Sequence, residues 1–260
     1  MPGIACDIAL PAAPGDRKLL AARAREALDG APIDANVVPA RGRRKRLLVA
    51  DMDSTIIGQE CIDELADMMG LKPQVAAITE RAMRGEIDFA PALRERVALL
   101  EGLELSELKR VYEERITPTP GAETLIATMR AHGATSLLVS GGFTFFTGRV
   151  AARLGFDHHQ ANELLSAGTA LTGMVAEPIL GRDAKRAALL DFLDRLGIGA
   201  GDVLAVGDGA NDLAMLEAAG LGVAFRAKPA VAAEADARID HGDLTALLFL
   251  QGYAAADFAG

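Results

Sequence analysis

The sequence contains no tryptophan, and only two tyrosines and nine phenylalanines occur among its 260 residues. Half of the residues are nevertheless hydrophobic, so a packed core has to be built mainly from leucine, alanine, valine and isoleucine. No apolar segment approaches the ~20 residues needed to span a bilayer. A signal peptide is not expected either, because Asp7 interrupts the short apolar stretch at the N-terminus and prolines follow it. We therefore expect no membrane partner.

Cysteine and histidine are also scarce. Cys6 and Cys61 are far apart and lack the spacing of metal ligands, so we expect two reduced thiols in a cytoplasmic protein. The four histidines are scattered. The adjacent pair His158 and His159 would point to opposite faces of a strand, which favours two surface positions over a shared metal site.

Positive charge is in deficit, with 27 Lys and Arg against 36 Asp and Glu and a formal net charge of −9. A nucleic-acid-binding protein needs a basic surface to neutralise phosphates, so the composition argues against a nucleic-acid partner. One local basic run comprises Arg41, Arg43, Arg44, Lys45 and Arg46. We interpret it as a solvated linker or strand edge, with a nucleic-acid or targeting role as the less favoured alternative.

Short apolar runs, three of which end in a polar or glycine-rich turn, indicate strands. They are residues 47–50, 136–139, 203–206 and 222–225. Continuous apolar runs of this length, separated by helical patterns, are typical of buried parallel strands between layers of helices. The predicted fold class is therefore α/β, with a Rossmann-like parallel sheet.

Between these runs the pattern becomes helical. Helices are predicted over residues 16–28 and 122–132, and another carries Leu189, Phe192 and Leu196 on one face and stops at Gly197. Residues 164–175 resemble a β-hairpin. The stretch from about 59 to 116 has helical patterns without a convincing strand, and residues 117–121 close it like a hinge. We interpret this stretch as a helical domain inserted after the first strand.

Polar residues gather where the predicted strands end. In an open parallel sheet, ligands bind beyond the carboxyl ends of the strands. The residues at these ends are Asp51, Asp53, Ser140, Gly141, Gly142, Asp208, Asn211 and Asp212. A single aspartate after a strand is more often a helix cap or turn residue, but the joint occurrence favours one site.

The pair Asp51 and Asp53 suggests phosphate chemistry. If both leave the strand on the same side, one carboxylate can attack while the other moves protons. Aspartate can serve as a covalent nucleophile, forming an acyl phosphate that water later hydrolyses. Carboxylates so close repel each other unless a cation lies among them, and Asp208 could supply a further ligand. Hard oxygen ligands and phosphate chemistry favour Mg²⁺.

An anion site is predicted beside the acidic residues. Ser140, with the backbone amides of Gly141 and Gly142 ahead of a predicted helix, can bind phosphoryl oxygens. Lys185 lies one turn before Leu189 on the sheet-facing side of its helix, where it could reach the same edge of the sheet. A solvated lysine in the first turn is the plainer alternative.

These segments resemble the four motifs of the haloacid dehalogenase superfamily in order and spacing, over roughly residues 46–225. The matching segments are Asp51-Met52-Asp53-Ser54-Thr55, Ser140, Lys185 and Gly207-Asp208-Gly209-Ala210-Asn211-Asp212. The resemblance implies an aspartyl-phosphate mechanism, with Asp51 as nucleophile and Asp53 as general acid and then base. It implies Mg²⁺ as the cofactor, held by Asp51, Asp208 and the backbone carbonyl of Asp53.

The resemblance also implies roles for the residues around the phosphoryl group. Lys185 and Ser140 would stabilise the transferring group, with the backbone of Gly141 beside it. Asn211 would contact the phosphate region of the substrate. Asp212 would orient Lys185 or the outer shell of the metal.

The inserted domain bears on the choice of substrate. Phosphoserine carries an ammonium and a carboxylate beside its phosphate, so a selective pocket needs an acid and a base. Glu60 lies where the insertion begins, and Arg96 flanks an apolar helix face formed by Leu93, Val97 and Leu100. A bidentate guanidinium suits a carboxylate. From the pattern alone, an arginine that snorkels along a helix flank is the plainer interpretation.

The insertion resembles the helical cap of the phosphoserine phosphatase subfamily. The matching segments are Gly58-Gln59-Glu60, Met83-Arg84-Gly85-Glu86 and residues 89–97. The resemblance implies that Glu60 binds the substrate ammonium, that Arg96 binds its carboxylate, and that Met83 and Phe89 line the lid. The implied activity is hydrolysis of O-phospho-L-serine to L-serine and phosphate, the last step of serine biosynthesis.

The predicted domains are a core of residues 41–57 and 118–260 and a cap of residues 58–117. Residues 1–40 form a short N-terminal region, long enough for only part of the ACT-type regulatory region that longer bacterial members of the subfamily carry. Two alternative functions stay open. One is action on another small phosphomonoester, including transfer to another alcohol; the other is a non-catalytic phosphoserine or amino-acid sensor. A homodimer is one open oligomeric state.

Overall fold

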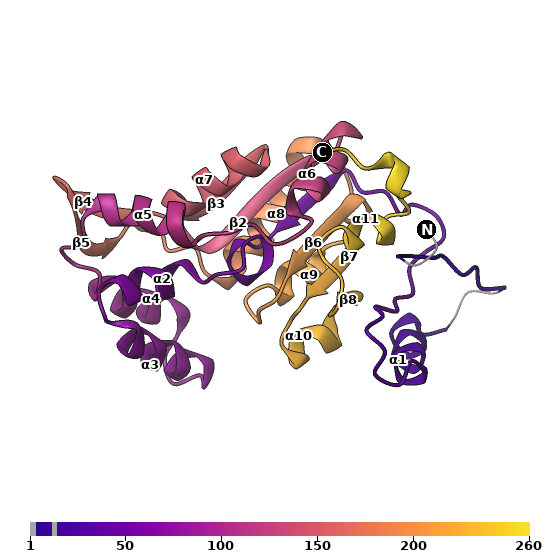
Figure 1. Ribbon diagram of the computed structural model, residues 1–260, viewed down its shortest axis with the longest axis horizontal. Helices are drawn as coiled ribbons and strands as arrows, with labels where there is room; N and C mark the ends of the chain where they lie inside the picture. Colours follow the sequence, from indigo (N-terminus) through magenta and orange to yellow (C-terminus); the bar gives the residue numbers. More distant parts are fainter. Residues whose placement is uncertain (1–3, 12–14) are drawn as a thin grey trace.

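The structure is a computed structural model that describes residues 4–11 and 15–260. Its centre is a six-stranded sheet of order β3-β2-β1-β6-β7-β8, in which every neighbouring pair is parallel, and β4 and β5 form a separate antiparallel hairpin (Figure 1). The strands are β1 (Leu47–Ala50), β2 (Thr135–Phe143), β3 (His158–Asn162), β4 (Leu164–Ala167), β5 (Ala170–Val175), β6 (Val203–Gly207), β7 (Leu221–Phe225) and β8 (Ala237–Ile239). The predicted parallel α/β fold is confirmed.

Helices cover both faces of the sheet, and α2 to α5 come between β1 and β2 in the sequence. The helices are α1 (Arg17–Ala27), α2 (Cys61–Met68), α3 (Lys72–Met83), α4 (Phe89–Ala98), α5 (Leu105–Arg115), α6 (Ala122–Ala131), α7 (Thr144–Leu154), α8 (Arg182–Leu196), α9 (Leu213–Ala218), α10 (Pro229–Glu234) and α11 (Ala246–Leu250). None of the described helices is long and apolar enough to cross a bilayer.

The central strand β1 shows why the two layers form. Leu47 and Val49 pack into the core beneath α8 and α9, whereas Leu48 and Ala50 pack into the core beneath α6 and α7. All four side chains are buried, as expected for a strand between two helical layers. The uninterrupted apolar run at residues 47–50 is therefore the signature of a strand with two buried faces.

The order of the strands creates a crevice at the carboxyl end of β1. From β1 the chain proceeds outward to β2 and β3, then returns to β6 on the other side of β1. The direction of winding thus reverses between β1 and β6, and such a switch point is where ligands bind in open parallel sheets.

Local signals fix several helix ends. The Asp16 side chain accepts a hydrogen bond from the Leu19 amide (3.0 Å) and caps α1. Helix α8 ends at Gly197, which has a left-handed φ of +59°. The predicted hairpin is also present, as β4 and β5.

Helices α2 to α5 lie at one end of the molecule (Figure 1) and connect to the core through two adjacent crossings of the chain. Ile57 pairs with Pro118 as an antiparallel bridge. The Gln59 side-chain amide donates to the Thr117 hydroxyl (2.8 Å), and the Thr117 amide donates back to the Gln59 side-chain oxygen (3.0 Å). The two crossings are therefore hydrogen-bonded to each other.

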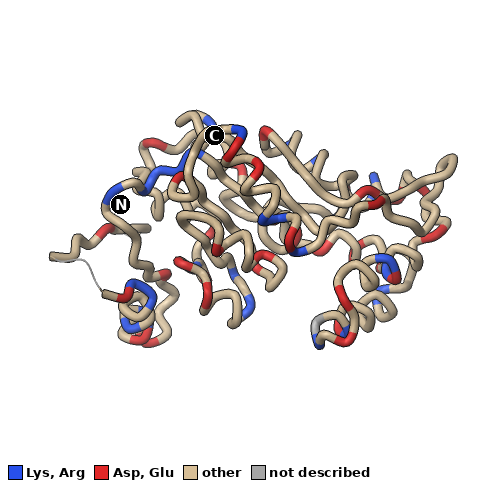
Figure 2. The backbone as a smooth tube through the Cα atoms, turned by 180° about the vertical axis from the view of Figure 1, so that it is seen from behind, with Lys and Arg blue, Asp and Glu red and all other residues tan. Residues whose placement is uncertain are grey.

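The basic run before β1 is partly built into the fold; Figure 2 shows it as a blue segment leading to the sheet. Arg43 donates to the carbonyl oxygens of Phe249 (2.6 Å) and Leu250 (2.9 Å). Lys45 is buried and donates to the Gly201 carbonyl oxygen (2.7 Å). The prediction of a solvated linker is wrong for these two side chains, because they lie against the core and bind its backbone carbonyls. Arg41 and Arg46 are exposed as predicted.

The N-terminal region runs along the outer edge of β8. The Asn36 side chain donates to the Arg238 carbonyl oxygen (2.9 Å) and accepts from the Arg238 amide (2.9 Å). The Asp34 carboxylate accepts from the amides of Asp240 (2.7 Å) and Gly242 (2.7 Å). These bonds attach residues 34–36 to the core.

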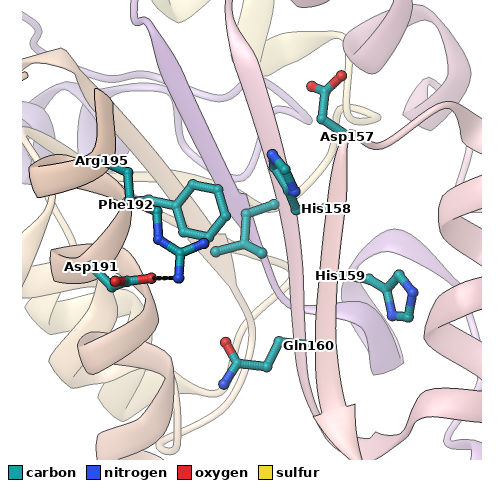
Figure 3. A pocket seen from close by; sticks show the side chains of 8 residues that line it. Asp157, His158, His159, Gln160, Asp191, Phe192 and Arg195 are labelled. Carbon is teal, nitrogen blue, oxygen red and sulfur yellow. Dashed lines mark ion pairs between the residues drawn. The ribbon is translucent and has the colours of Figure 1, made fainter. Parts of the chain in front are cut away.

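Cysteines and histidines lie as the sequence predicts. Cys6 is exposed, Cys61 is buried, and neither forms a disulfide. The rings of His158 and His159 leave opposite faces of β3 (Figure 3). His158 packs edge-on against Phe192, with ring centroids 4.9 Å apart.

Candidate active site

Three carboxylates meet at the switch point. Asp51 directly follows β1, Asp208 directly follows β6, and Asp212 lies at the start of α9. One carboxylate oxygen from each lies within 4.8 Å of the others. Asp51 and Asp212 are buried, whereas Asp208 is half-buried. The predicted assembly of these residues at one edge of the sheet is observed.

Lys185 holds two of these carboxylates. Its Nζ lies 2.6 Å from Oδ1 of Asp51 and 2.6 Å from Oδ1 of Asp212, and its side chain is buried. The other oxygen of Asp212 accepts from the amides of Asp208 (3.2 Å) and Gly209 (3.0 Å). Because both of its oxygens have partners, Asp212 fixes the ammonium and the loop after β6 in one arrangement.

The glycine before Asp208 makes this arrangement possible. A Cβ at Gly207 would lie 2.4 Å from the Asp212 carboxylate. Any other residue at this position would displace that carboxylate, so the tight contact requires glycine.

The buried charges do not balance. Burial raises the pKa of Asp51 well above its usual value, the charge of Asp212 adds to this shift, and Lys185 opposes it. Burial and the charge of Asp212 raise the pKa of Asp208 to about 6. Burial lowers the pKa of Lys185, but Asp51 and Asp212 outweigh it and leave this pKa above its usual value. Three acids thus surround one ammonium, and a further cation would relieve their repulsion.

Asp53 connects the core to the first helix of the cap. Its Oδ2 accepts from the Ser140 hydroxyl (3.0 Å), and its Oδ1 accepts from the Cys61 amide at the start of α2 (2.9 Å). The Gly142 amide in turn donates to the Ser140 hydroxyl (2.8 Å). A Cβ at Gly142 would lie 2.9 Å from the Asp53 carboxylate, so this glycine permits the close approach.

Glu60 lies at the rim of the same site and is held by Ser54. The Ser54 hydroxyl donates to Oε1 of Glu60 (2.6 Å), and Ser54 has a left-handed φ of +56°. Surrounding protein raises the pKa of Glu60 to about 7, with a further contribution from the charge of Asp53, although solvent still reaches the residue. Ser54 was not expected to have this role from the sequence.

Arg96 is half-buried on α4. Its Nε donates to the Ala92 carbonyl oxygen (3.3 Å), and its Nη1 donates to the Thr79 hydroxyl (3.4 Å). Burial lowers the pKa of Arg96, and the charges of Asp63 and Glu60 oppose this. These two bonds of Arg96 thus stay within α3 and α4.

Phe89 carries the contact between cap and core. A Cβ at Gly141 would lie 3.2 Å from its ring, and a Cβ at Gly181 would lie 3.3 Å from it. Phe89 thus packs on the carboxyl-terminal part of β2 and on the segment before α8. This strand includes the residues that the sequence analysis placed after it, Ser140, Gly141 and Gly142. Met83 ends α3, and its side chain lies outside the described part of the structure. Asn211 is half-buried in the loop between β6 and α9.

One buried residue beside the site was missed by the sequence analysis. The Asn162 side chain donates to the carbonyl oxygens of Gly141 (2.9 Å) and Leu180 (3.3 Å) and accepts from the Leu180 amide (2.7 Å). It therefore ties the carboxyl-terminal part of β2 to the segment that precedes α8. The sequence signal was a polar residue at the end of β3, a strand that was not among those predicted.

A separate cavity of about 500 Å³ lies between β3 and α8 (Figure 3). It is lined mostly by polar side chains, among them Asp157, His158, Gln160, Asp191 and Arg195. Asp191 and Arg195 pair with each other there at 2.8 Å. None of the residues that line this cavity belongs to the acidic site.

Comparisons with known proteins agree with this geometry. The model of a family described as haloacid dehalogenase-like hydrolase matches residues 48–217. A curated phosphoserine phosphatase of Albidiferax ferrireducens is 50% identical over 217 residues, covering 82% of this chain and 92% of that protein. One of a Polaromonas species is 48% identical over 210 residues, covering 79% and 89%.

Solved structures are similar as well. A HAD family hydrolase of Salmonella enterica serovar Typhi superposes with a TM-score of 0.84 at 35% identity, covering 89% of this chain and 79% of that one. A structure described as a phospho-aspartyl intermediate analogue of phosphoserine phosphatase has a TM-score of 0.74 at 39% identity, covering 79% and 98%.

Proposed function

The chain belongs to the haloacid dehalogenase-like hydrolase family, and we propose that it hydrolyses O-phospho-L-serine to L-serine and phosphate through an aspartyl-phosphate intermediate. The observation that carries this proposal is the contact of Lys185 with Asp51 beside Ser140 and Asp53. It combines a restrained nucleophile, a cation for the phosphoryl group and a second carboxylate for proton transfer. The named relatives supply the substrate class.

In the proposed reaction, Asp51 attacks phosphorus and the P–O bond to the serine oxygen breaks. Lys185 binds Oδ1 of Asp51, so the other oxygen is the one available for attack. Asp53 gives its proton to the leaving serine oxygen. It then takes a proton from the water that attacks the aspartyl phosphate, which releases phosphate and restores Asp51.

Around the phosphoryl group, the chain supplies positive charge and hydrogen-bond donors. Lys185, the Ser140 hydroxyl and the backbone amide of Gly141 are proposed to bind its oxygens, with Asn211 beside them. Donors fixed in advance stabilise the developing charge without reorganising during the reaction. The bonds from Asn162 to the Gly141 carbonyl and to Leu180 hold this end of β2 against the segment before α8.

A divalent cation fits the acidic centre. The donors are carboxylate oxygens within 4.8 Å of one another, and three acids surround one ammonium, so a hard cation such as Mg²⁺ suits the site. Asp51, Asp208 and the backbone carbonyl of Asp53 would hold it. Asp212 would not bind the cation directly, because its oxygens already bind Lys185 and two amides. When bound, Mg²⁺ would offset negative charge on the phosphoryl group.

The cap is proposed to select the substrate. Glu60 would pair with the ammonium of phosphoserine and Arg96 with its carboxylate, and Phe89 and Met83 would line the lid. Arg96 keeps donors for this purpose, since its two intramolecular bonds, at 3.3 and 3.4 Å, are long.

Phosphate release from a panel of phosphomonoesters tests the proposal. L-phosphoserine should be the best substrate, ahead of phosphoethanolamine and an aryl phosphate, and turnover should need Mg²⁺. Higher kcat/KM for another ester would assign a different phosphatase activity. Phosphoserine binding without phosphate release would indicate a sensor, and faster product formation with an added alcohol would indicate phosphotransfer.

A further inference from the structure

The hairpin β4–β5 follows the core strand β3 but packs against the cap. Figure 1 shows it at the end of the molecule, beside α5. A Cβ at Gly173 on β5 would lie 3.0 Å from the Cβ of Glu101 and 3.3 Å from the Ala98 carbonyl oxygen. Gly173 also has a φ of +71°. The strand thus meets the end of α4 at a distance that requires glycine.

Backbone hydrogen bonds join the hairpin to the loop between α4 and α5. The Leu171 amide donates to the Leu103 carbonyl oxygen (2.8 Å), and the Gly102 amide donates to the Leu171 carbonyl oxygen (2.9 Å). The Leu105 amide donates to the Thr169 carbonyl oxygen (2.8 Å). The Leu171 side chain is buried. Separating the hairpin from the cap would break these bonds and expose an apolar side chain.

Toward the core, the hairpin ends in the bond from the Ala176 amide to the Glu163 carbonyl oxygen (2.9 Å). Single stretches of chain on either side of this bond lead back to β3 and to α8. The hairpin is thus joined to the core by two neighbouring stretches of chain. The cap is joined to the core in the same way, at Ile57 and Pro118, which also pair with each other.

We propose that the hairpin is part of the lid, so that residues 58–117 and 164–175 move as one body when the active site opens and closes. The hinge then includes residues 163 and 176 in addition to the crossings at Ile57 and Pro118. The proposal rests on the proposed function in one respect, since it takes the cap to open for phosphoserine.

Two glycine substitutions in the hairpin provide a matched test. Gly168 and Gly173 both have positive φ, +62° and +71°, so alanine strains the backbone at either position. Only at Gly173 does the new Cβ meet the cap, because nothing lies within 4 Å of a Cβ at Gly168. Gly173→Ala should lower kcat/KM for phosphoserine about tenfold by displacing α4, and Gly168→Ala should stay within about twofold. Equal effects would overturn the proposal.

A disulfide across the junction tests joint movement directly. Glu104 faces Ala170 as an antiparallel bridge, and the flanking hydrogen bonds make this a non-hydrogen-bonded pair, whose Cα separation suits a disulfide. The variant Glu104→Cys/Ala170→Cys, in a Cys6→Ser background, should keep kcat/KM within about twofold on oxidation. A large loss that a reductant reverses, absent from the single-cysteine variants, would show that the two parts separate during turnover.

Hydrogen exchange gives an answer that does not depend on catalysis. In Asp51→Asn, which should bind phosphoserine without turning it over, the amides of Gly102, Leu105 and Leu171 should exchange slowly with and without phosphoserine. Protection that develops only with phosphoserine would overturn the proposal. Inactivity of the parent enzyme toward phosphoserine would instead refute the proposed function, while the exchange without ligand would still report on the junction.

Discussion

The ammonium nitrogen of Lys185 lies 2.6 Å from Oδ1 of Asp51, and both side chains are almost completely buried. The pair comes from the first turn of α8 and the end of β1, which are 134 residues apart in the sequence. It restrains the proposed nucleophile and places the cation that the phosphoryl group requires. Since Asp212 binds the same ammonium, the three residues should respond to substitution as a unit.

Lys185→Met should remove activity and leave two buried carboxylates without their common partner. Breaking a buried ion pair costs about 3–5 kcal/mol, and we expect a loss of that size in the free energy of unfolding, measured by denaturant titration in chelator. Lys185→Met/Asp212→Asn should recover part of this loss, because it removes one of the unpaired charges. A double variant as unstable as the sum of both single variants would show that the charges act independently.

Chelation should abolish activity, and Mg²⁺ should restore it. Mg²⁺ should also raise the Tm of the parent protein, because a ligand that binds only the native state stabilises it. Asp208→Asn should reduce this rise in Tm. Ca²⁺ should inhibit, since its larger and more flexible coordination shell would engage both oxygens of Asp51. Full activity after verified metal removal would refute the proposed mechanism.

Substitution of Asp51 and substitution of Asp53 should affect turnover differently. Asp51→Asn should abolish turnover, because an amide cannot form the acyl phosphate. Asp53→Asn should slow the reaction by roughly 10²–10⁴, as is typical when general acid–base catalysis is lost. Trapping of labelled phosphate followed by peptide mapping should place the phosphate on Asp51. Label on another residue would overturn the assignment.

Arg96→Ala should raise KM for phosphoserine and reduce kcat/KM by about 10- to 150-fold, the range expected for one charge-assisted hydrogen bond of roughly 1.5–3 kcal/mol. Phosphoethanolamine and an aryl phosphate, which lack the carboxylate, should respond little. Arg110→Ala is the control, since Arg110 is exposed on α5 and pairs with Glu107 of the same helix. An equal effect of Arg96→Ala on all three substrates would make Arg96 a structural residue of the cap.

The pH dependence of KM should report on Glu60, whose pKa is raised to about 7. Below that pH the carboxyl group is neutral and cannot pair with the substrate ammonium, so KM should fall as pH rises through 7. Glu60→Gln should lose this component while keeping the titration of the phosphate, which both proteins share. Because the raised pKa belongs to the folded state, the contribution of this group to stability is complete below its ordinary pKa of 4.5 and is lost as pH rises to about 7.

Much of the fold was predictable because strands buried on both faces leave uninterrupted apolar runs, as in residues 47–50 and 203–206. Although His158 and His159 were treated as neighbours on a strand, neither β3 nor β8 was among the predicted strands. Both are edge strands. β3 begins with His158, His159 and Gln160, and β8 has three residues. An edge strand needs fewer apolar residues, so periodicity cannot identify it.

The residues of the acidic centre were predictable because each follows a recognisable strand or lies on the inner face of a helix. The residues that hold these side chains in place were not predictable. Ser54 reaches Glu60 through a left-handed backbone conformation, and Asn162 reaches Gly141 from an unpredicted strand. Such contacts depend on backbone geometry that residue spacing does not encode.

The bonds from Asn36 to β8 have a consequence for solution behaviour. A strand at the edge of a sheet presents unpaired amides and carbonyls, which invite another chain to add a strand. Asn36 occupies the amide and the carbonyl of Arg238 on that edge. A chain shortened to begin at residue 41 would keep every residue of the acidic centre yet leave this edge open. Its expected defect is aggregation through β8, with intact chemistry in the remaining monomer.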